Sequence, residues 1–442
     1  MESTTIILFW TLAAMLCIMM IVQGLSRRVD IFSIRNIYLA GFIVYQIVSP
    51  ASALRSGNFY GFRIDDPERA AGWMMLFAYI YVVIYLLSYH RIGLARRLAA
   101  MFTRFIGGNV KANDSMLTGV AVSVIIIALA MRLIGDQVLV LRGLSINIAV
   151  ALAAVACATI GWVWGKKRLN PVVLLITCSI ISISMFVSLA GSFSRRPLIS
   201  ILAGFSWGAY HRWARLLAPS RLLLSMLPLI LVVVAIVSAF TAIRSHKTGQ
   251  TAVQDTLTQM KSANIASGTG DLLGGQSSGS GALWILDHYP RDIQYRPLFS
   301  IRYMIYWYIP RVLWEDKPVP LGNELATIAK LQGVNRSVIT LPPGVIGFAA
   351  AEGGFYAIVI YALFFGQFTR LFDEMIKLNP TNPFVILPIG CTTGQFLGLA
   401  RGDMALFTNV AVVGTVSAFV LLYLSSLAFG RTRASAHGLH ST

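Results

Sequence analysis

Charged side chains are scarce in this sequence. Only 12% of its 442 residues are Asp, Glu, Lys or Arg, whereas 56% are hydrophobic and the mean hydropathy is +0.71. A soluble chain of this length carries a much larger polar fraction. The composition therefore excludes an ordinary soluble protein and indicates an all-α polytopic membrane protein.

The positive net charge does not indicate nucleic-acid binding. The formal charge is +18, but the basic residues stand in short clusters between apolar runs, as the positive-inside rule predicts for cytoplasmic loops. We therefore expect membrane lipid around most of the chain and no nucleic-acid partner.

The motifs of several enzyme classes are missing. The sequence has no P-loop, no Gly-x-Gly-x-x-Gly after a strand, no His-Glu-x-x-His and no Gly-x-Ser-x-Gly. Its four cysteines lie within apolar runs and lack metal-ligand spacing. We therefore expect no cofactor and no metal. Because no soluble domain is large enough to bind a nucleotide sugar, a transferase of this kind would use a lipid-linked sugar donor.

The apolar runs predict about eleven membrane-spanning helices, each near the ~20 residues that a bilayer requires. The chain begins without a basic segment before its first apolar run, so this run is expected to be a retained span instead of a cleaved signal. The predicted spans cover residues 5–24, 33–52, 71–90, 115–134, 145–165, 170–191, 197–216, 222–243, 346–368, 383–400 and 405–429.

Arginine and lysine clusters fall in alternate loops, which sets an orientation. Loops that contain Arg27, Arg91 and Lys166 then face the cytoplasm, with the N-terminus outside and the C-terminus inside. The chain accordingly divides into an N-terminal bundle of about eight spans, an outward loop, about three C-terminal spans and a cytoplasmic tail. Their residues are 1–243, 244–345, 346–430 and 431–442.

One stretch of the outward loop, Phe299–Gly322, combines aromatic and charged residues. Tyr and Trp rings favour the headgroup level of a bilayer, so the aromatics predict a segment at the membrane surface. The cations of this stretch predict a site for an anionic group such as a phosphate. The aromatics are Phe299, Tyr303, Tyr306, Trp307, Tyr308 and Trp314, and the cations are Arg302, Arg311 and Lys317.

Four arginines are expected on the outward side, where the positive-inside rule disfavours them: Arg195, Arg196, Arg311 and Arg401. Arginine donates paired hydrogen bonds to phosphate oxygens and stays protonated. Several arginines meeting at one mouth would therefore bind a pyrophosphate. Each arginine has the alternative role of an anchor that extends its charge to the lipid headgroups.

Three outward residues are candidates for a general base: Glu352, Asp316 and His288. Each has a structural alternative. Glu352 is expected near a helix N-terminus, where it can bind a sugar hydroxyl or simply cap the helix. Asp316 can pair with a neighbouring cation, and a lone histidine is more often structural than catalytic.

The sequence Arg401-Gly402-Asp403 joins two predicted spans on the outward side. The glycine allows a sharp reversal of the chain, so these residues can form a turn and nothing more. Alternatively, Arg401 and Asp403 orient a bound sugar or phosphate at the same mouth.

The run Ile309–Pro318 resembles the Ile-Pro-Arg-x-x-Trp-x-x-Lys-Pro signature of oligosaccharide repeat-unit polymerases, the O-antigen polymerase group. Gly322 follows Arg311 after ten residues, and Glu352-Gly353-Gly354 opens the part of the chain after the long loop. Both features look like patterns of that group. The Ser194–Pro197 turn is similar to the Ser-Arg-Gly turn of the related O-antigen ligases, with Arg196 in place of the glycine.

The resemblance implies an inverting, metal-independent glycosyltransferase at the outer face of the bacterial inner membrane. Its substrate would be an undecaprenyl-pyrophosphate-linked oligosaccharide, and a chain-length regulator protein would be a partner. Arg311, Arg196 and Arg401 would hold pyrophosphate, with Arg195, Lys317, Arg302 and Asp403 as further substrate ligands. Glu352, Asp316 or His288 would activate the acceptor hydroxyl.

Two other functions remain open at this point. An O-antigen ligase, which moves a finished chain to lipid A core, shares the same architecture. A flippase for lipid-linked oligosaccharides would need a cationic path through the spans, and the sequence offers little charge at their centres.

Overall fold

The computed structural model describes residues 2–106, 112–135, 137, 142–167, 169–189, 195–218, 221–222, 224, 278–331 and 341–438. Every regular element among these residues is a helix, which confirms the predicted all-α class. Eight helical segments of the described part are long and apolar enough to cross a membrane. Their length and composition are those of a multi-pass membrane protein.

The eight candidate spans follow the predicted ones closely. One of them is interrupted by a π-helical turn, η1 (Ile43–Val48), between two α-helices. The helices that form these spans are α1 (Glu2–Leu25), α2 (Ile34–Phe42) with α3 (Ser49–Ser56), α4 (Pro67–Arg91), α6 (Asp114–Gly135), α7 (Arg142–Lys166), α8 (Pro171–Leu189), α16 (Gly344–Leu378) and α19 (Met404–Gly438).

The predicted span at 383–400 is wrong as a single helix. The chain forms two short helices there, α17 (Pro383–Gly390) and α18 (Thr393–Leu399), separated by a turn. Pro388 lies inside α17 and lacks a backbone N–H, which weakens the helix just before the turn. The apolar composition of this run concealed the break.

Two other predicted spans are not among the candidate membrane spans, for different reasons. The span at 197–216 corresponds to α9 (Arg195–Arg212), which carries three arginines in 18 residues and is not among the candidate spans. The span at 222–243 lies almost entirely outside the described residues. The described residues also form four shorter helices, which are α5 (Leu94–Ile106), α13 (Ser278–His288), α14 (Phe299–Tyr306) and α15 (Leu321–Ile328).

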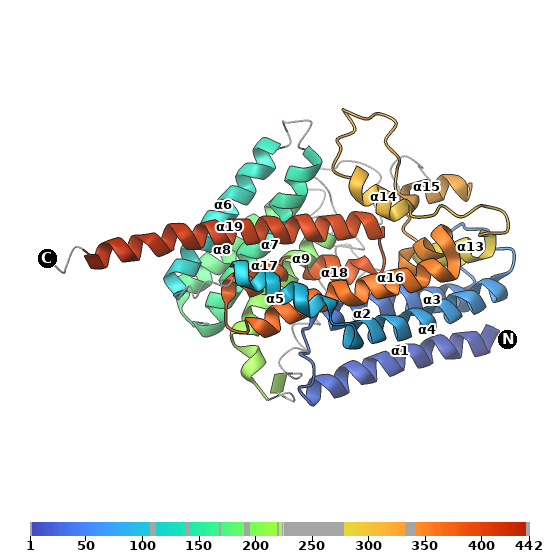
Figure 1. Ribbon diagram of the computed structural model, residues 1–442, viewed down its shortest axis with the longest axis horizontal. Coiled ribbons are helices and arrows are strands. Elements are labelled where there is room, and N and C mark those ends of the chain that lie inside the picture. Colours follow the sequence, from blue (N-terminus) through green and yellow to red (C-terminus); the bar gives the residue numbers. More distant parts are fainter. Residues whose placement is uncertain are drawn as a thin grey trace, which may run out of the picture. The chain divides into compact units, whose positions relative to one another are not determined.

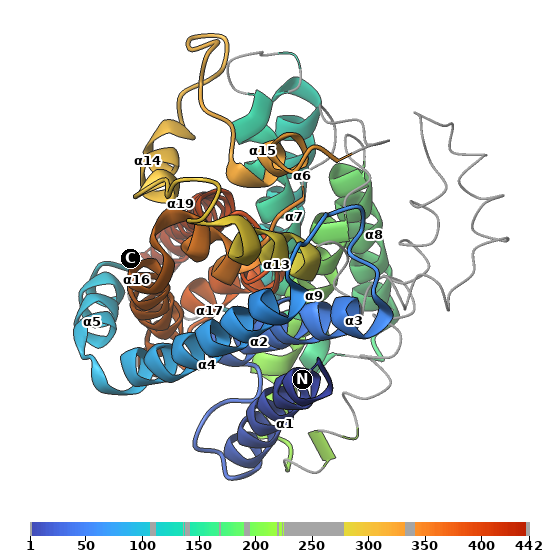
Figure 2. The same cartoon turned by 90° about the vertical axis from the view of Figure 1, so that its right-hand side faces the viewer.

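The chain forms two compact units whose segments alternate along the sequence. Unit 1 comprises Met1–Ile92, Met226–Arg370 and Phe396–Asn409, and unit 2 comprises Gly93–Ser225, Leu371–Gln395 and Val410–Thr442. In unit 1, η1 contacts α1, α2, α3, α4 and α13. Helices α13, α14 and α15 lie at the end of this unit where α16 begins and where the chain starts (Figure 1 and Figure 2).

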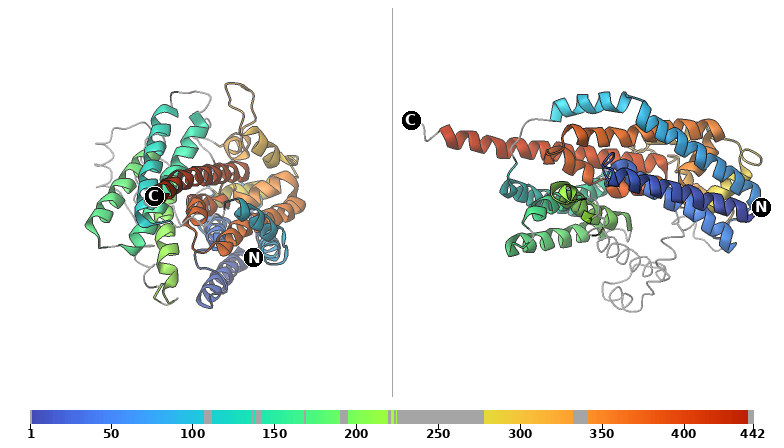
Figure 3. Two further views of the ribbon diagram at one scale, coloured as in Figure 1. Left: turned by 60° about the vertical axis from the view of Figure 1, so that its left-hand side comes forward. Right: turned by 90° about the horizontal axis from the view of Figure 1, so that it is seen from below.

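In unit 2, α7 packs against α6, α8 and α9, as Figure 3 shows from two further directions. Small residues bring α7 and α9 so close that their backbones touch. A methyl group on Gly208 of α9 would lie 1.9 Å from the carbonyl oxygen of Ala158 in α7, and one on Gly204 would lie 2.7 Å from that of Ala154. Small residues serve this purpose in membrane helices because they allow close van der Waals packing.

Gly208→Ala should lower the free energy of unfolding by about 1–3 kcal/mol, since the added methyl group must push two packed backbones apart. Gly72→Ala is the matched control, because a methyl group there has no atom within 4 Å. Thermal unfolding in detergent measures both changes. Equal unfolding midpoints for the two variants would contradict the tight contact between α7 and α9.

Candidate functional site

Helix α16 breaks immediately after Glu352. Gly354 has a φ of +57°, in the left-handed region that glycine adopts without a steric penalty, and α16 resumes beyond it. A methyl group at Gly354 would also lie 2.8 Å from the hydroxyl oxygen of Tyr295. Helix α16 begins at Gly344, before the start of the predicted span 346–368. Glu352 therefore lies at a break inside the helix and not at its start.

The Glu352 carboxylate is buried and accepts hydrogen bonds from two segments. One oxygen accepts from the Ser300 hydroxyl and from the Ser300 N–H at 3.1 Å, and the other accepts from the Tyr361 hydroxyl. The N–H of Arg296 also donates to the carbonyl of Ala351 at 3.0 Å. These bonds hold the start of α14 against the break in α16.

Gln46 of η1 fixes the position of two neighbouring chain segments. Its side-chain amide donates to the Ala400 carbonyl at 2.8 Å and accepts from the Ile346 N–H at 3.3 Å. It is fully buried, so both bonds replace lost contacts with water. Gln46 thereby ties the start of α16 to the turn that precedes α19, and it does so from a π-helical turn, an element frequent at functional sites.

The Arg401-Gly402-Asp403 sequence forms the expected tight turn. The Asp403 carboxylate accepts a hydrogen bond from the Leu406 N–H at 3.0 Å and so caps the start of α19. The guanidinium of Arg401 lies over the ring of Tyr45, 5.6 Å from its centre. Asp403 is almost fully buried, whereas Arg401 is half-buried.

Lys317 stabilises the irregular segment that follows α14. Its buried ammonium group donates to the carbonyls of Trp307 and Ile309 at 2.9 and 2.8 Å. Burial, and secondarily the charge of Arg311, lowers the pKa of Lys317 below its ordinary value. Lys317 therefore holds the segment that contains Arg311. Two of the three N–H donors of its ammonium group are used in these bonds.

Arg311 itself is exposed. Among the residues that the structure describes, none forms a hydrogen bond or an ion pair with its guanidinium group. It lies in the irregular segment that Lys317 holds, and its charge lowers the pKa of both Tyr303 and Lys317. Arg311 is thus a fixed-charge donor group available to a ligand.

Tyr303 lies near Lys317, whose ammonium nitrogen is 5.9 Å from the centre of its ring. Burial and then the charge of Asp403 raise the pKa of Tyr303 to about 12, while Arg311 acts in the opposite direction. Asn409 adds a second connection, because its amide donates to the Met304 carbonyl at 2.9 Å. We call one group of unit 1 side chains the loop–break cluster, because contacts or the effect of a charge connect its members: Ser300, Tyr303, Arg311, Lys317, Glu352, Tyr361 and Asp403.

Some predicted site residues lie outside this cluster or cannot be placed in it. Arg302 is exposed on α14. Asp316 and Glu315 are exposed, and neither pairs with Lys317 or Arg311 in the described part of the chain. Arg195 and Arg196 open α9 in unit 2, but their side chains lie outside the described residues.

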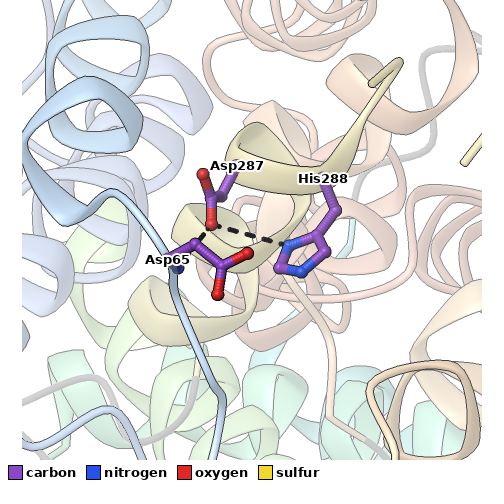
Figure 4. A group of neighbouring side chains, drawn as sticks. All are labelled: Asp65, Asp287 and His288. Atoms are coloured by element: carbon purple, nitrogen blue, oxygen red, sulfur yellow. Dashed lines mark hydrogen bonds and ion pairs between the residues drawn. The ribbon is translucent and has the colours of Figure 1, made fainter. Parts of the chain in front are cut away.

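His288 belongs to a different group of side chains, at the junction of α13 and α4 (Figure 4). Its Nδ1 lies 3.0 Å from the Trp284 carbonyl, and its ring stacks on that of Trp284. The neighbouring Asp287 carboxylate accepts from the Asp65 N–H at 2.7 Å and pairs with Arg69 at 2.7 Å.

The same group places three potential metal ligands close together. One oxygen or nitrogen atom from each of Asp65, Asp287 and His288 lies within 4.8 Å of the others. The Asp287 oxygens and the His288 Nδ1 already have partners, however. We therefore interpret this group as an electrostatic connection that fixes α13 to the beginning of α4.

The sequence did not indicate Ser300, Tyr303, Tyr361, Gln46 or Asn409 as site residues. Ser300 lies 52 positions from its partner Glu352, and Gln46 lies 354 positions from Ala400. No local motif marks such contacts. The one available signal was Tyr361, which is a hydrogen-bonding side chain within an apolar span.

Lys317→Met should lower the free energy of unfolding by about 1–3 kcal/mol, because the substitution leaves the Trp307 and Ile309 carbonyls without their donor. Lys330→Met removes an exposed lysine from the same part of the chain and should change stability little. Thermal unfolding in detergent compares the two. If both variants unfold like the wild type, Lys317 does not stabilise this segment.

No curated protein and no solved structure matched the chain. A protein family described as a domain of unknown function, DUF8712, matched residues 84–422. This region contains every residue of the loop–break cluster. The match covers well over half of the sequence, and the chain therefore belongs to the DUF8712 family.

Proposed function

We propose that the protein polymerises undecaprenyl-pyrophosphate-linked oligosaccharide repeat units at a membrane surface, by inverting, metal-independent glycosyl transfer. One observation carries this proposal. Ser300 of α14 donates to the buried Glu352 carboxylate, and the segment directly after α14, which Lys317 holds, carries the exposed Arg311. Both lie in a helical bundle of membrane-spanning character. The resemblance of Ile309–Pro318 to repeat-unit polymerases supports the same reaction.

In this mechanism, Arg311 binds the pyrophosphate of the donor. An acceptor hydroxyl attacks the anomeric carbon of the donor sugar, and the bond from this carbon to the pyrophosphate oxygen breaks. The departing pyrophosphate takes the electron pair, and a fixed guanidinium stabilises the charge that develops on it. Attack from the side opposite the leaving group inverts the anomeric configuration.

Glu352 is the general base that the geometry favours. Its carboxylate already accepts hydroxyl hydrogen bonds from Ser300 and Tyr361, so it is oriented to accept one from a sugar. An acceptor hydroxyl that replaces one of these partners would lie where its proton can pass to the carboxylate. Asp403 is a candidate for positioning the substrate, because its carboxylate is fixed by its hydrogen bond at the N-terminus of α19.

Arg401 and Arg302 remain proposed ligands of the substrate, and Arg195 and Arg196 stay predictions from the sequence, since their side chains lie outside the described residues. Lys317 has a different part in this proposal, since its ammonium group holds the turn that presents Arg311. Asp316 and His288 are weaker candidates for the base, because no described contact connects either of them to the Glu352 carboxylate.

Purified protein, incubated with its lipid-linked repeat unit in the presence of a chelator, should yield a ladder of longer chains on a gel. Arg311→Ala should reduce the rate of elongation by about 10²–10³-fold, the usual effect of removing one donor that stabilises developing negative charge. Lys330→Ala is the control, because it removes an exposed cation outside the cluster. A normal ladder from folded Arg311→Ala would refute the role of this arginine.

Glu352→Gln tests the base separately. The amide has nearly the same shape but cannot take a proton, so elongation should slow by about 10²–10⁴-fold while the substrate still binds. Equilibrium binding of the lipid-linked unit and the thermal unfolding midpoint identify any loss of folding. Elongation at the wild-type rate would exclude Glu352 as the base.

The same assay distinguishes the two alternative functions. A ligase would bind the lipid-linked unit but would form product only when lipid A core is added. A flippase, reconstituted in vesicles, would move the unit across the membrane without elongating it. Either result, in place of a ladder, would overturn the proposed polymerase.

A further inference from the structure

The aromatic residues of the Phe299–Gly322 stretch do not form the exposed belt that the sequence suggests. Tyr303 is buried, and Phe299 stacks on it with ring centres 6.3 Å apart. Tyr306 packs edge-on against Trp314 at 5.1 Å. Among the six aromatics, Tyr308 is the one classed as exposed. Each of the six rings is thus paired with another ring of the stretch.

Aliphatic side chains occupy the exposed face instead. On α14, Ser300 and Tyr303 face inward, whereas Ile301 and Ile305, one turn apart, face outward. Ile305 is 67% exposed and Leu313 is 72% exposed. We call this surface the aliphatic ridge, and it consists of Ile301, Ile305, Ile309, Val312 and Leu313.

Helix α14, which carries part of the ridge, is attached to a candidate membrane span. Ser300 and Arg296 bind the chain at Glu352 and Ala351, directly before the second part of α16. That part begins with Phe355 and Tyr356, which are also exposed. In both Figure 1 and Figure 2, α14 lies at the periphery of unit 1. Helix α14 is thus attached to a candidate membrane span just before exposed apolar residues of that span.

Several backbone groups below the ridge are hydrogen-bonded internally, although this segment is not helical. The N–H groups of Ile309, Leu313 and Trp314 donate to carbonyls three residues earlier in the chain. Lys317 donates to the carbonyls of Trp307 and Ile309. These bonds lower the cost of bringing an irregular segment close to hydrocarbon, because lipid chains offer no hydrogen-bonding partner. The remaining backbone groups require the water of the headgroup region.

Charged residues border the ridge without interrupting it. Arg302 and Arg311 are exposed beside it, and Glu315 and Asp316 are exposed where it ends. This arrangement suits a segment whose aliphatic side chains enter the acyl region while its charges remain among the headgroups.

We propose that the aliphatic ridge inserts into the outer part of a lipid bilayer, at the boundary between headgroups and acyl chains. This assignment does not depend on the proposed glycosyltransferase activity. It also gives a physical reason for the exposure of Arg311, because insertion places its guanidinium group at the level of lipid phosphates.

Spin labels at single cysteines test this proposal in the full-length protein. In a background with Cys17→Ser and Cys178→Ser, a nitroxide is attached to Ile305→Cys, Leu313→Cys or the control Lys330→Cys. All three positions are exposed, so the substitutions should not disturb the fold. The protein is reconstituted in phosphatidylcholine vesicles, and collisions with oxygen and with a water-soluble nickel complex are measured.

Oxygen concentrates in the acyl region and the nickel complex stays in water. The labels at Ile305 and Leu313 should therefore show an oxygen-to-nickel ratio several-fold above that at Lys330. Equal ratios at the three positions would overturn the proposal, since the ridge would then face water. Low access to both reagents at Ile305 and Leu313 would also overturn it, because a protein surface would then cover the ridge.

Discussion

The hydrogen bonds of the Glu352 carboxylate are the interaction on which the described site depends. Ser300 of α14 and Tyr361, which lies beyond the break in α16, donate these bonds. One side chain therefore connects α14 with both parts of α16. Two glycines after Glu352 make the break possible, and burial makes each bond costly to lose. Together with the bond from the Arg296 N–H to the Ala351 carbonyl, this connection fixes α14, and so the segment that carries Arg311, to α16.

In the same part of unit 1, polar side chains also form hydrogen bonds with backbone groups at helix ends and in turns. Gln46 does so for the Ala400 carbonyl and the Ile346 N–H, Asp403 for the start of α19, and Lys317 for the turn after α14. In water these groups could be left to solvent, but at a membrane they need partners within the protein. Polar side chains in the cluster therefore combine a supporting role with the proposed chemistry, and Lys317 is the clearest case.

The sequence predicted much of the fold because membrane spans depend on local composition. The candidate spans matched predicted ones, whereas the break between α17 and α18 was missed because the run 383–400 is uniformly apolar despite Pro388. Glu352, Arg311, Lys317 and Asp403 were recognised as candidates from charge at unexpected places. Their partners Ser300, Tyr303 and Tyr361 were not, because those contacts depend on how the chain bends at Gly353-Gly354.

The central claim is that Arg311 and Glu352 serve one bound substrate. The most direct measurement is an electron cryo-microscopy structure of the protein in lipid nanodiscs with its undecaprenyl-pyrophosphate-linked repeat unit. The account predicts pyrophosphate oxygens within hydrogen-bonding distance of the Arg311 guanidinium, with the anomeric carbon on the side of the Glu352 carboxylate. Pyrophosphate bound elsewhere, with Arg311 and Glu352 both free of the substrate, would contradict it.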